Sequence, residues 1–326
     1  MSKAAWFSRP GDASVIEWID VPDPVPGPWD VLIDVKAFGI NRADIVQREG
    51  KYPPPAGVTD IPGLEASGVV LACGKRVTRF APGDRVMTLV PGGAYANLLT
   101  ADSRTTWKVP DPVPFTVAAA LPEMLMTAWM NLITIGRLKR GETILIHAGA
   151  SGIGMAAIQL AVWRRASVAV TCGTPGKQAF CQSLGASLAI NYRETPSFSS
   201  VIKQQMKGVH LILDPVGASY LTENLSCLLP DGRLILIGLM GGVLADKVNL
   251  GQMLVKRLRI TGSTLRSLPI LKKAAVARDL DKRVLPWVFS GAFHCHIDRV
   301  FKPEELPDAH RLMESNQTMG KLVVCF

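Results

Sequence analysis

The sequence lacks the cysteine patterns that organise disulfide-rich domains and zinc lobes. Its cysteines occur singly, without a CxxC pair or a regular spacing, at Cys73, Cys172, Cys181, Cys227, Cys295 and Cys325. A disulfide framework and a four-thiolate zinc lobe are therefore excluded. We expect reduced thiols in a reducing compartment.

Recognisable targeting and membrane segments are also missing. Residues 1–18 have neither the apolar core of a signal peptide nor the Arg-rich, acid-poor composition of a transit peptide. Each apolar stretch contains Gly, Pro or a charged residue well before the roughly 18 residues that a membrane-spanning helix needs. These absences predict a cytoplasmic protein with no membrane partner.

Long runs of basic residues are absent as well, although the chain carries a formal net charge of +9. Lysines and arginines occur in pairs such as Lys139-Arg140 and Lys256-Arg257, which suit solvated helix faces better than a nucleic-acid arm. Nucleic acid is therefore not favoured as a partner. The positive charge would attract an anionic small molecule.

What the sequence does contain is enough apolar material for a large core, because 48% of its 326 residues are hydrophobic and only 19% are charged. A single core rarely grows beyond roughly 250–300 residues, so we predict two domains. Residues 1–121 alternate short β-type runs with Pro- and Gly-rich turns, which is typical of a small, irregular β-barrel. The same texture returns at 292–326, which we expect to rejoin residues 1–121.

Residues 122–291 have a different pattern, in which apolar strands alternate with helical segments. The strand sequences are TILIHAG, SVAVTC, LAINY, VHLILD, GRLILIG and RITGST. This alternation predicts an α/β domain with a doubly wound, parallel, six-stranded sheet.

A glycine-rich turn follows the first of these strands and opens the next helix. Gly149, Gly152 and Gly154 let the turn tighten, let the backbone approach a pyrophosphate and let the helix pack closely on the strand. The amides of the helix N-terminus then face the phosphates. Placed in a βαβ unit, the pattern predicts dinucleotide binding.

The residues after the second strand indicate whether the bound dinucleotide is NAD or NADP. An NAD-binding protein usually has Asp or Glu there, bound to the ribose 2′-hydroxyl. This chain has no acid from Thr171 to Lys177, and Lys177 is positioned to meet a 2′-phosphate. Tyr192 and Arg193, after the third strand, could close on the same phosphate. The pattern favours NADPH over NADH.

Motifs spread along nearly the whole chain resemble a known family. They are Asn41-Arg42-Ala43-Asp44, Gly63-Leu64-Glu65-Ala66-Ser67-Gly68, Leu236-Ile237-Gly238-Leu239-Met240-Gly241-Gly242 and Gly320-Lys321. The chain resembles the zinc-free quinone oxidoreductases of the medium-chain dehydrogenase/reductase superfamily, related to zeta-crystallin, and most closely the branch of the p53-inducible quinone reductase. The resemblance implies a GroES-like β-barrel catalytic domain, a Rossmann domain that binds NADPH, and a homodimer joined by the sixth strands near residues 259–262.

The resemblance also implies roles for the matched positions. Tyr52, Asn41 and Thr127 would be the catalytic residues at the nicotinamide end of the cofactor. The cofactor-binding residues would be Gly149, Ser151, Gly152, Ile153 and Gly154 for the pyrophosphate, Gly173, Lys177 and Tyr192 for the 2′-phosphate, and Gly238, Leu239, Met240 and Leu265 for the nicotinamide.

Two expected metal ligands are replaced. Relatives with catalytic zinc have a Cys near the position of Asn41 and a His at the position of Leu64, so we expect no metal. On a strand, His294 and His296 would place their imidazoles on one face, but no further pattern of metal ligands accompanies them. His147 is interpreted as a packed histidine and Glu65 as a structural residue.

The mechanism follows from these absences. Without a metal or a nucleophile paired with a base, the chain can position a hydride donor beside an acceptor that is already electrophilic. A quinone fits, because its reduced form is aromatic and needs little help from a proton donor. One alternative is an enone or enoyl thioester reductase that uses a tyrosine as proton donor. Another is a non-enzymatic NADPH- or RNA-binding protein of the zeta-crystallin kind.

Overall fold

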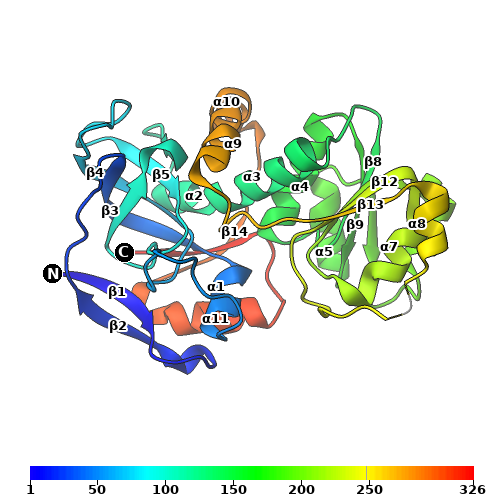
Figure 1. Cartoon of the computed structure of the whole chain (residues 1–326), viewed down its shortest axis with the longest axis horizontal. Helices are drawn as coiled ribbons and strands as arrows, with labels where there is room; N and C mark the ends of the chain where they lie inside the picture. The colour runs from blue at the N-terminus through cyan, green and yellow to red at the C-terminus, as the bar shows by residue number, and fades with distance from the viewer. Residues whose placement is uncertain (247) are drawn as a thin grey trace. The chain divides into compact units, whose positions relative to one another are not determined.

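The computed structural model describes residues 1–246 and 248–326, and the chain divides into two compact units (Figure 1). The first unit comprises Met1–Met126 and Leu265–Phe326, and the second comprises Thr127–Thr264.

This division differs from the expected boundaries at 121/122 and 291/292, because residues 265–291 pack with the first unit. Helix α9 (Ile270–Arg283) contacts the short turn at Ser103–Thr105. Trp107 donates from Nε1 to the carbonyl of Ala277 on α9 at 3.1 Å. The pattern of a helix shows that one face is buried, but it does not show which domain covers that face.

The first unit is mostly β-structure. Its strands are β1 (Ser2–Phe7), β2 (Ile16–Val21), β3 (Asp30–Ile40), β4 (Glu65–Cys73), β5 (Arg85–Leu89), β6 (Leu98–Asp102), β7 (Thr106–Lys108), β14 (Ile297–Phe301) and β15 (Lys321–Cys325). Its other helices are α1 (Arg42–Arg48), α2 (Phe115–Ala120), α10 (Leu285–Trp287) and α11 (Leu306–Glu314), and α3 (Pro122–Trp129) crosses into the second unit.

Seven of these strands form one sheet in the order β14-β15-β3-β4-β5-β7, with β6 paired to β3. Burial alternates along β3, where Val31, Ile33 and Val35 face the core, as the period of two requires. Register shifts interrupt the β3–β4 ladder, so the sheet is irregular. The C-terminal strand β15 pairs antiparallel with β3, as expected for a tail that rejoins the β-rich region.

The second unit is a parallel α/β sandwich. Its strands are β8 (Thr143–Ile146), β9 (Ser167–Cys172), β10 (Leu188–Asn191), β11 (Val209–Asp214), β12 (Leu228–Leu236) and β13 (Arg259–Gly262). Its helices are α4 (Gly152–Trp163), α5 (Pro175–Ser183), α6 (Phe198–Met206), α7 (Leu221–Cys227) and α8 (Leu250–Lys256).

The six strands lie in the order β10-β9-β8-β11-β12-β13, and every neighbouring pair is parallel. Numbered from the first strand of the unit, this is 3-2-1-4-5-6, the order of a dinucleotide-binding domain. The prediction of a doubly wound, six-stranded sheet is confirmed. The strand order reverses between β8 and β11, and ligands of such sheets bind at the carboxyl ends of the strands beside that point.

The expectation about apolar segments was wrong at one place. Phe115–Ile135 forms a helical run of 21 residues that is apolar enough to cross a membrane by length and composition, despite Pro122 and Glu123. In the most apolar 18-residue window of this run, 78% is buried inside the protein, as in a core helix.

Candidate functional site

The glycine turn between β8 and α4 has no room for side chains. A Cβ at Gly149 would lie 2.7 Å from the Cβ of Val170, and a Cβ at Gly154 would collide with the carbonyl of Gly149. The close approach of helix and strand therefore depends on glycine. Ser151 caps the helix, since its hydroxyl accepts a hydrogen bond from the N–H of Gly154 at 3.0 Å.

The amide groups of Gly152 and Ile153 lie in the first turn of α4, where the helix itself offers no acceptor. The same helix end carries the positive pole of the dipole. Ser151, the cap residue of this turn, is exposed, so an anion could reach the turn from its side. The residues fit the pyrophosphate of a dinucleotide.

A second cluster lies at the carboxyl ends of β9 and β10. A Cβ at Gly173 would lie 2.7 Å from the phenol oxygen of Tyr192 and 3.3 Å from Nε of Arg193. Thr174 caps α5 by accepting from the N–H of Lys177 at 3.2 Å, which places Lys177 in the first turn of that helix. The structure thus brings Gly173, Tyr192 and Arg193 together, with Lys177 on the adjoining helix and no acidic residue among them.

His147 is a packed residue, as the sequence interpretation held. Its Nδ1 lies 2.8 Å from the hydroxyl of Thr171, and its Nε2 lies 2.8 Å from Oδ1 of Asn224. Burial lowers the pKa of His147 to about 4, with the Asn224 contact opposing the shift. A neutral imidazole held on both nitrogens does not act as a general base.

The loop after β12 carries Gly238, Leu239 and Met240. It is tied to the loop after β11, because the N–H of Met240 donates to the carbonyl of Pro215 at 3.1 Å. Leu239 and Met240 are exposed apolar residues at the carboxyl end of the sheet. Thr127 is also in the second unit and is buried, whereas Leu265, Asn41 and Tyr52 belong to the first.

In the first unit, a buried ion pair joins Glu65 at the start of β4 to Lys321 at the start of β15. The side chains are 0% and 4% exposed, and Nζ of Lys321 lies 2.5 Å from Oε1 of Glu65. Asn41 bonds to both, donating from Nδ2 to Glu65 at 2.9 Å and accepting from Lys321 at 2.7 Å. The N–H of Glu123 donates to the second carboxylate oxygen at 2.8 Å, so Glu65 is fully engaged.

A chain of buried polar groups starts at Asp44, three residues after Asn41. Oδ2 of Asp44 accepts from the N–H of Asn41 at 2.8 Å and from the phenol of Tyr95 at 2.9 Å. Tyr95 in turn lies 3.3 Å from Nε2 of His310. Burial raises the pKa of Asp44 to about 6, and the two hydrogen bonds oppose it.

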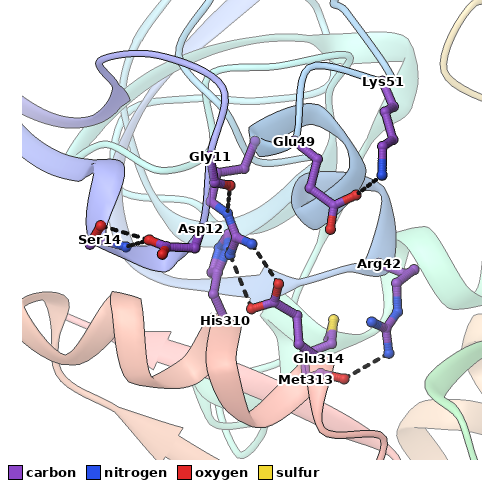
Figure 2. Close-up of polar contacts among 10 residues, drawn as sticks. Gly11, Asp12, Ser14, Arg42, Glu49, Lys51, His310, Met313 and Glu314 are labelled. Atoms are coloured by element: carbon purple, nitrogen blue, oxygen red, sulfur yellow. Dashed lines mark hydrogen bonds and ion pairs between the residues drawn. The ribbon is translucent and has the colours of Figure 1, made fainter.

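This series of hydrogen bonds ends at Arg48, whose partners His310 and Glu314 lie on helix α11. Figure 2 shows these partners beside Gly11. Arg48 donates to the carbonyl of Gly11 at 3.0 Å, to Glu314 at 2.6 Å and to Nδ1 of His310 at 3.1 Å. Because arginine only donates, Nδ1 of His310 accepts and its proton lies on Nε2, facing Tyr95. Burial, reinforced by Arg48, lowers the pKa of His310 to about 3, so this histidine is neutral.

Tyr52 lies against Arg266. The guanidinium is 5.3 Å from the centre of the Tyr52 ring, and Nη1 donates to the Tyr52 carbonyl at 3.3 Å. Burial raises the pKa of the Tyr52 phenol, and Arg266 opposes that shift. The Tyr52 hydroxyl makes no hydrogen bond to any residue that the structure describes.

Sequence reasoning missed three residues of this first-unit cluster. Asp44 and Lys321 stood inside motifs that carried the family resemblance, but nothing local indicated their partners. Arg266 follows Leu265 and carried no signal of its own. Among residues 1–246 and 248–326, no group of three His, Cys, Asp or Glu side chains could hold a metal ion.

Known proteins match both units. A model of the alcohol dehydrogenase GroES-like domain matches residues 27–111, and a model of the zinc-binding dehydrogenase family matches residues 152–281. The human synaptic vesicle membrane protein VAT-1 homolog is 30% identical over 318 residues, covering 92% of this chain and 80% of that protein.

Two further matches carry an activity in their names. The probable quinone oxidoreductase of Schizosaccharomyces pombe is 30% identical over 320 residues, covering 97% of this chain and 95% of that protein. The solved structure of Escherichia coli quinone oxidoreductase complexed with NADPH is 27% identical, has a TM-score of 0.90, and covers 99% of this chain and 100% of that one.

The buried carboxyl of Asp44 predicts a pH-dependent stability. Its pKa in the fold, about 6, lies above its ordinary value of 3.8, so the fold favours the protonated form. The contribution of Asp44 to the free energy of unfolding is fully present below about pH 4. It is lost as the pH rises through 6, which lowers the free energy of unfolding by roughly 3 kcal/mol. Asp44→Asn keeps an acceptor for Asn41 and Tyr95 and should not show this loss.

Urea unfolding of the protein, of Asp44→Asn and of the exposed control Asp20→Asn would measure the effect. Between pH 4 and pH 7, Asp44→Asn should gain stability relative to the unmutated protein, whereas the control should not. A difference between Asp44→Asn and the unmutated protein that does not change with pH would contradict the assignment.

Proposed function

Because the chain belongs to the medium-chain dehydrogenase/reductase superfamily, among its quinone oxidoreductase-like members, we propose that it is an NADPH-dependent quinone reductase that needs no metal ion. We further propose that it is of the zeta-crystallin-like kind, nearest to the branch of the p53-inducible quinone reductase. The observation that carries the proposal is the buried ammonium group of Lys321 on Glu65.

The positive charge of Lys321 bears on whether a metal ion could bind beside Glu65. Its ammonium group donates to the carbonyl of Ile40 at 3.0 Å, as well as to Asn41 and Glu65. A cation therefore already occupies the oxygen ligands around Glu65. A second, divalent cation at these oxygens would have to displace or face it, which supports chemistry without a metal at this site.

The cofactor-binding residues support NADPH. The glycine turn would hold the pyrophosphate, and Lys177, Tyr192 and Arg193 would bind the 2′-phosphate. When bound, NADPH supplies the hydride. The residues of the chain bind the cofactor, orient it and position the acceptor.

A quinone is the acceptor that best suits a site without a dedicated proton donor. The neutral His147 and His310 are both held in hydrogen bonds away from such a role. One observation favours an enone or enoyl thioester reductase instead, namely the phenol of Tyr52, which could donate a proton to carbon. Acceptor preference separates the two functions.

The first experiment is NADPH oxidation with ortho-quinones, para-quinones, enones and enoyl thioesters, before and after exhaustive chelation. Quinones should be reduced fastest, and the rate should survive chelation. Turnover of enones alone would favour the alternative reductase, and loss of activity that zinc restores would overturn the metal-free proposal. Tight NADPH binding without turnover of any acceptor would indicate a non-enzymatic role.

The second prediction concerns cofactor choice. A charge-assisted contact to phosphate contributes about 1.5–3 kcal/mol, so NADPH should bind roughly tenfold to over a hundredfold more tightly than NADH. Lys177→Ala should narrow that preference in a fluorescence titration, whereas Lys139→Ala, on the surface of the same unit, should not. Equal affinity of the unmutated protein for both cofactors would refute the assignment.

The homodimer is proposed from the free edge of the parallel sheet. Among the residues that the structure describes, strand β13 is the last in the sheet order. Helix α8, which precedes β13 in the chain and packs on β12, exposes three apolar side chains, Leu250, Leu254 and Val255. An unpaired edge next to exposed apolar residues suits a second copy of the chain, paired about a two-fold axis.

Leu254 and Leu271 offer a matched test of the dimer, because they are 80% and 69% exposed on α8 and α9. Leu254→Glu should give the mass of a monomer in light scattering, while Leu271→Glu should keep the mass of a dimer. A monomeric unmutated protein, or a Leu254→Glu variant that stays dimeric, would rule out this interface.

A further inference from the structure

Arg266 is a buried cation whose position is fixed by the first unit. Its side chain donates from Nε to the carbonyl of Pro91 at 2.6 Å and from Nη1 to the carbonyl of Tyr52 at 3.3 Å. Lys273 donates to the Arg266 carbonyl at 2.6 Å and so holds the backbone as well. The residue is 7% exposed.

One nitrogen of this guanidinium has no acceptor. Nη2 is buried and makes no hydrogen bond, and Arg266 forms no ion pair with any residue that the structure describes. Asp44, Tyr52 and Glu123 are close enough to stabilise its charge, and burial lowers its pKa. Nε of Arg85, Arg164 and Arg233 is also buried without an acceptor, but of these four arginines Arg266 is the one that lies against Tyr52. A buried charged donor without an acceptor is destabilising, and a ligand that supplies the acceptor removes this cost.

The neighbouring cations differ from Arg266 in this respect. The ammonium group of Lys321 has three oxygen acceptors, and that of Lys273 has the Arg266 carbonyl. Arg266 also lies against the ring of Tyr52, the residue expected to border the acceptor. The open donor and the acceptor-binding tyrosine therefore belong to one cluster.

We propose that Nη2 of Arg266 binds the carbonyl oxygen of the acceptor that becomes anionic when the hydride arrives. This inference rests on the proposed function. The acceptor gains one hydride, which is one proton and two electrons, while NADPH becomes NADP⁺. A quinone thereby becomes the hydroquinone monoanion, and a proton from water completes the hydroquinone.

Arg266 thus takes the electrophilic role that a metal ion has in other carbonyl reductions. A fixed, desolvated guanidinium binds an oxyanion more strongly than a neutral carbonyl, so it acts mainly in the transition state. Its loss should lower kcat more than it raises KM. Removal of one such donor typically lowers kcat by about 10²–10³.

The binding test uses 4-nitrophenol with the NADP⁺ complex, in which no turnover occurs. Its phenolate resembles the hydroquinone anion and absorbs differently from the phenol, so the preference for the anion can be read from a spectrophotometric pH titration. Arg266→Met should reduce that preference by about tenfold or more. Tyr52→Phe should retain it, because the guanidinium remains.

Arg79→Met is the matched control, because Arg79 is an exposed arginine of the same unit that is paired with Asp281 at 3.0 Å. NADPH affinity and the thermal midpoint report whether each variant folds. If Arg266→Met does not fold, Arg266→Gln takes its place with the same expectations, since its amide can still donate to Pro91.

An unchanged preference for the phenolate in the folded Arg266 variant, or an unchanged kcat with quinones, would overturn the inference. Failure of the proposed function gives a different result. In that case the unmutated protein reduces no quinone, yet it still binds 4-nitrophenolate through Arg266.

Discussion

The buried pair of Glu65 and Lys321 is the interaction on which the first unit depends. It joins β4 to β15, and through Asn41 and Glu123 it also holds the start of α1 and the start of α3. Gly39 on β3 is a glycine for the same reason, because a Cβ there would collide with the Glu65 carboxylate. Removing one partner of a buried pair costs about 3–5 kcal/mol, since the other charge is left without compensation. The sheet and the polar cluster around Asn41 are therefore specified by the same residues.

The two candidate clusters, one in each unit, are built in opposite ways, and this decides how well each could be predicted from the sequence. The second-unit cluster depends on missing side chains at Gly149 and Gly154, in the turn and helix start after β8, and at Gly173, directly after β9. Both strands have a clear apolar pattern. Both signals are local, so the parallel, six-stranded sheet and the turn could be predicted. The first-unit cluster consists of charges that meet from distant segments. Glu65 and Lys321 are 256 positions apart, and a periodicity within a short window carries no information about such a pair.

The placement of α9 shows the same limit at the level of a domain. Its helical pattern was compatible with either unit, and the bond from Trp107 to Ala277, 170 positions away, shows which unit covers it. The run Phe115–Ile135 shows a different limit, because Pro122 and Glu123 interrupt its apolar sequence while α3 begins directly after α2 and extends the helical run. Pro122 is the first residue of α3, where a proline breaks no intrahelical bond.

The direction of the buried hydrogen bonds links the anchor of α11 to Asp44, which supports the charge of Arg266. Arg48 donates to His310, His310 donates to Tyr95, and Tyr95 donates to Asp44, so every group in the chain delivers a proton donor toward one carboxylate oxygen. Asp44 is consequently held as an acceptor, and its negative charge is available to stabilise the nearby cation Arg266. Protonation of Asp44 would remove that support. The charge of Arg266 is thus supported by a network of neutral and charged groups that extends from Asp44 to Arg48 and helix α11.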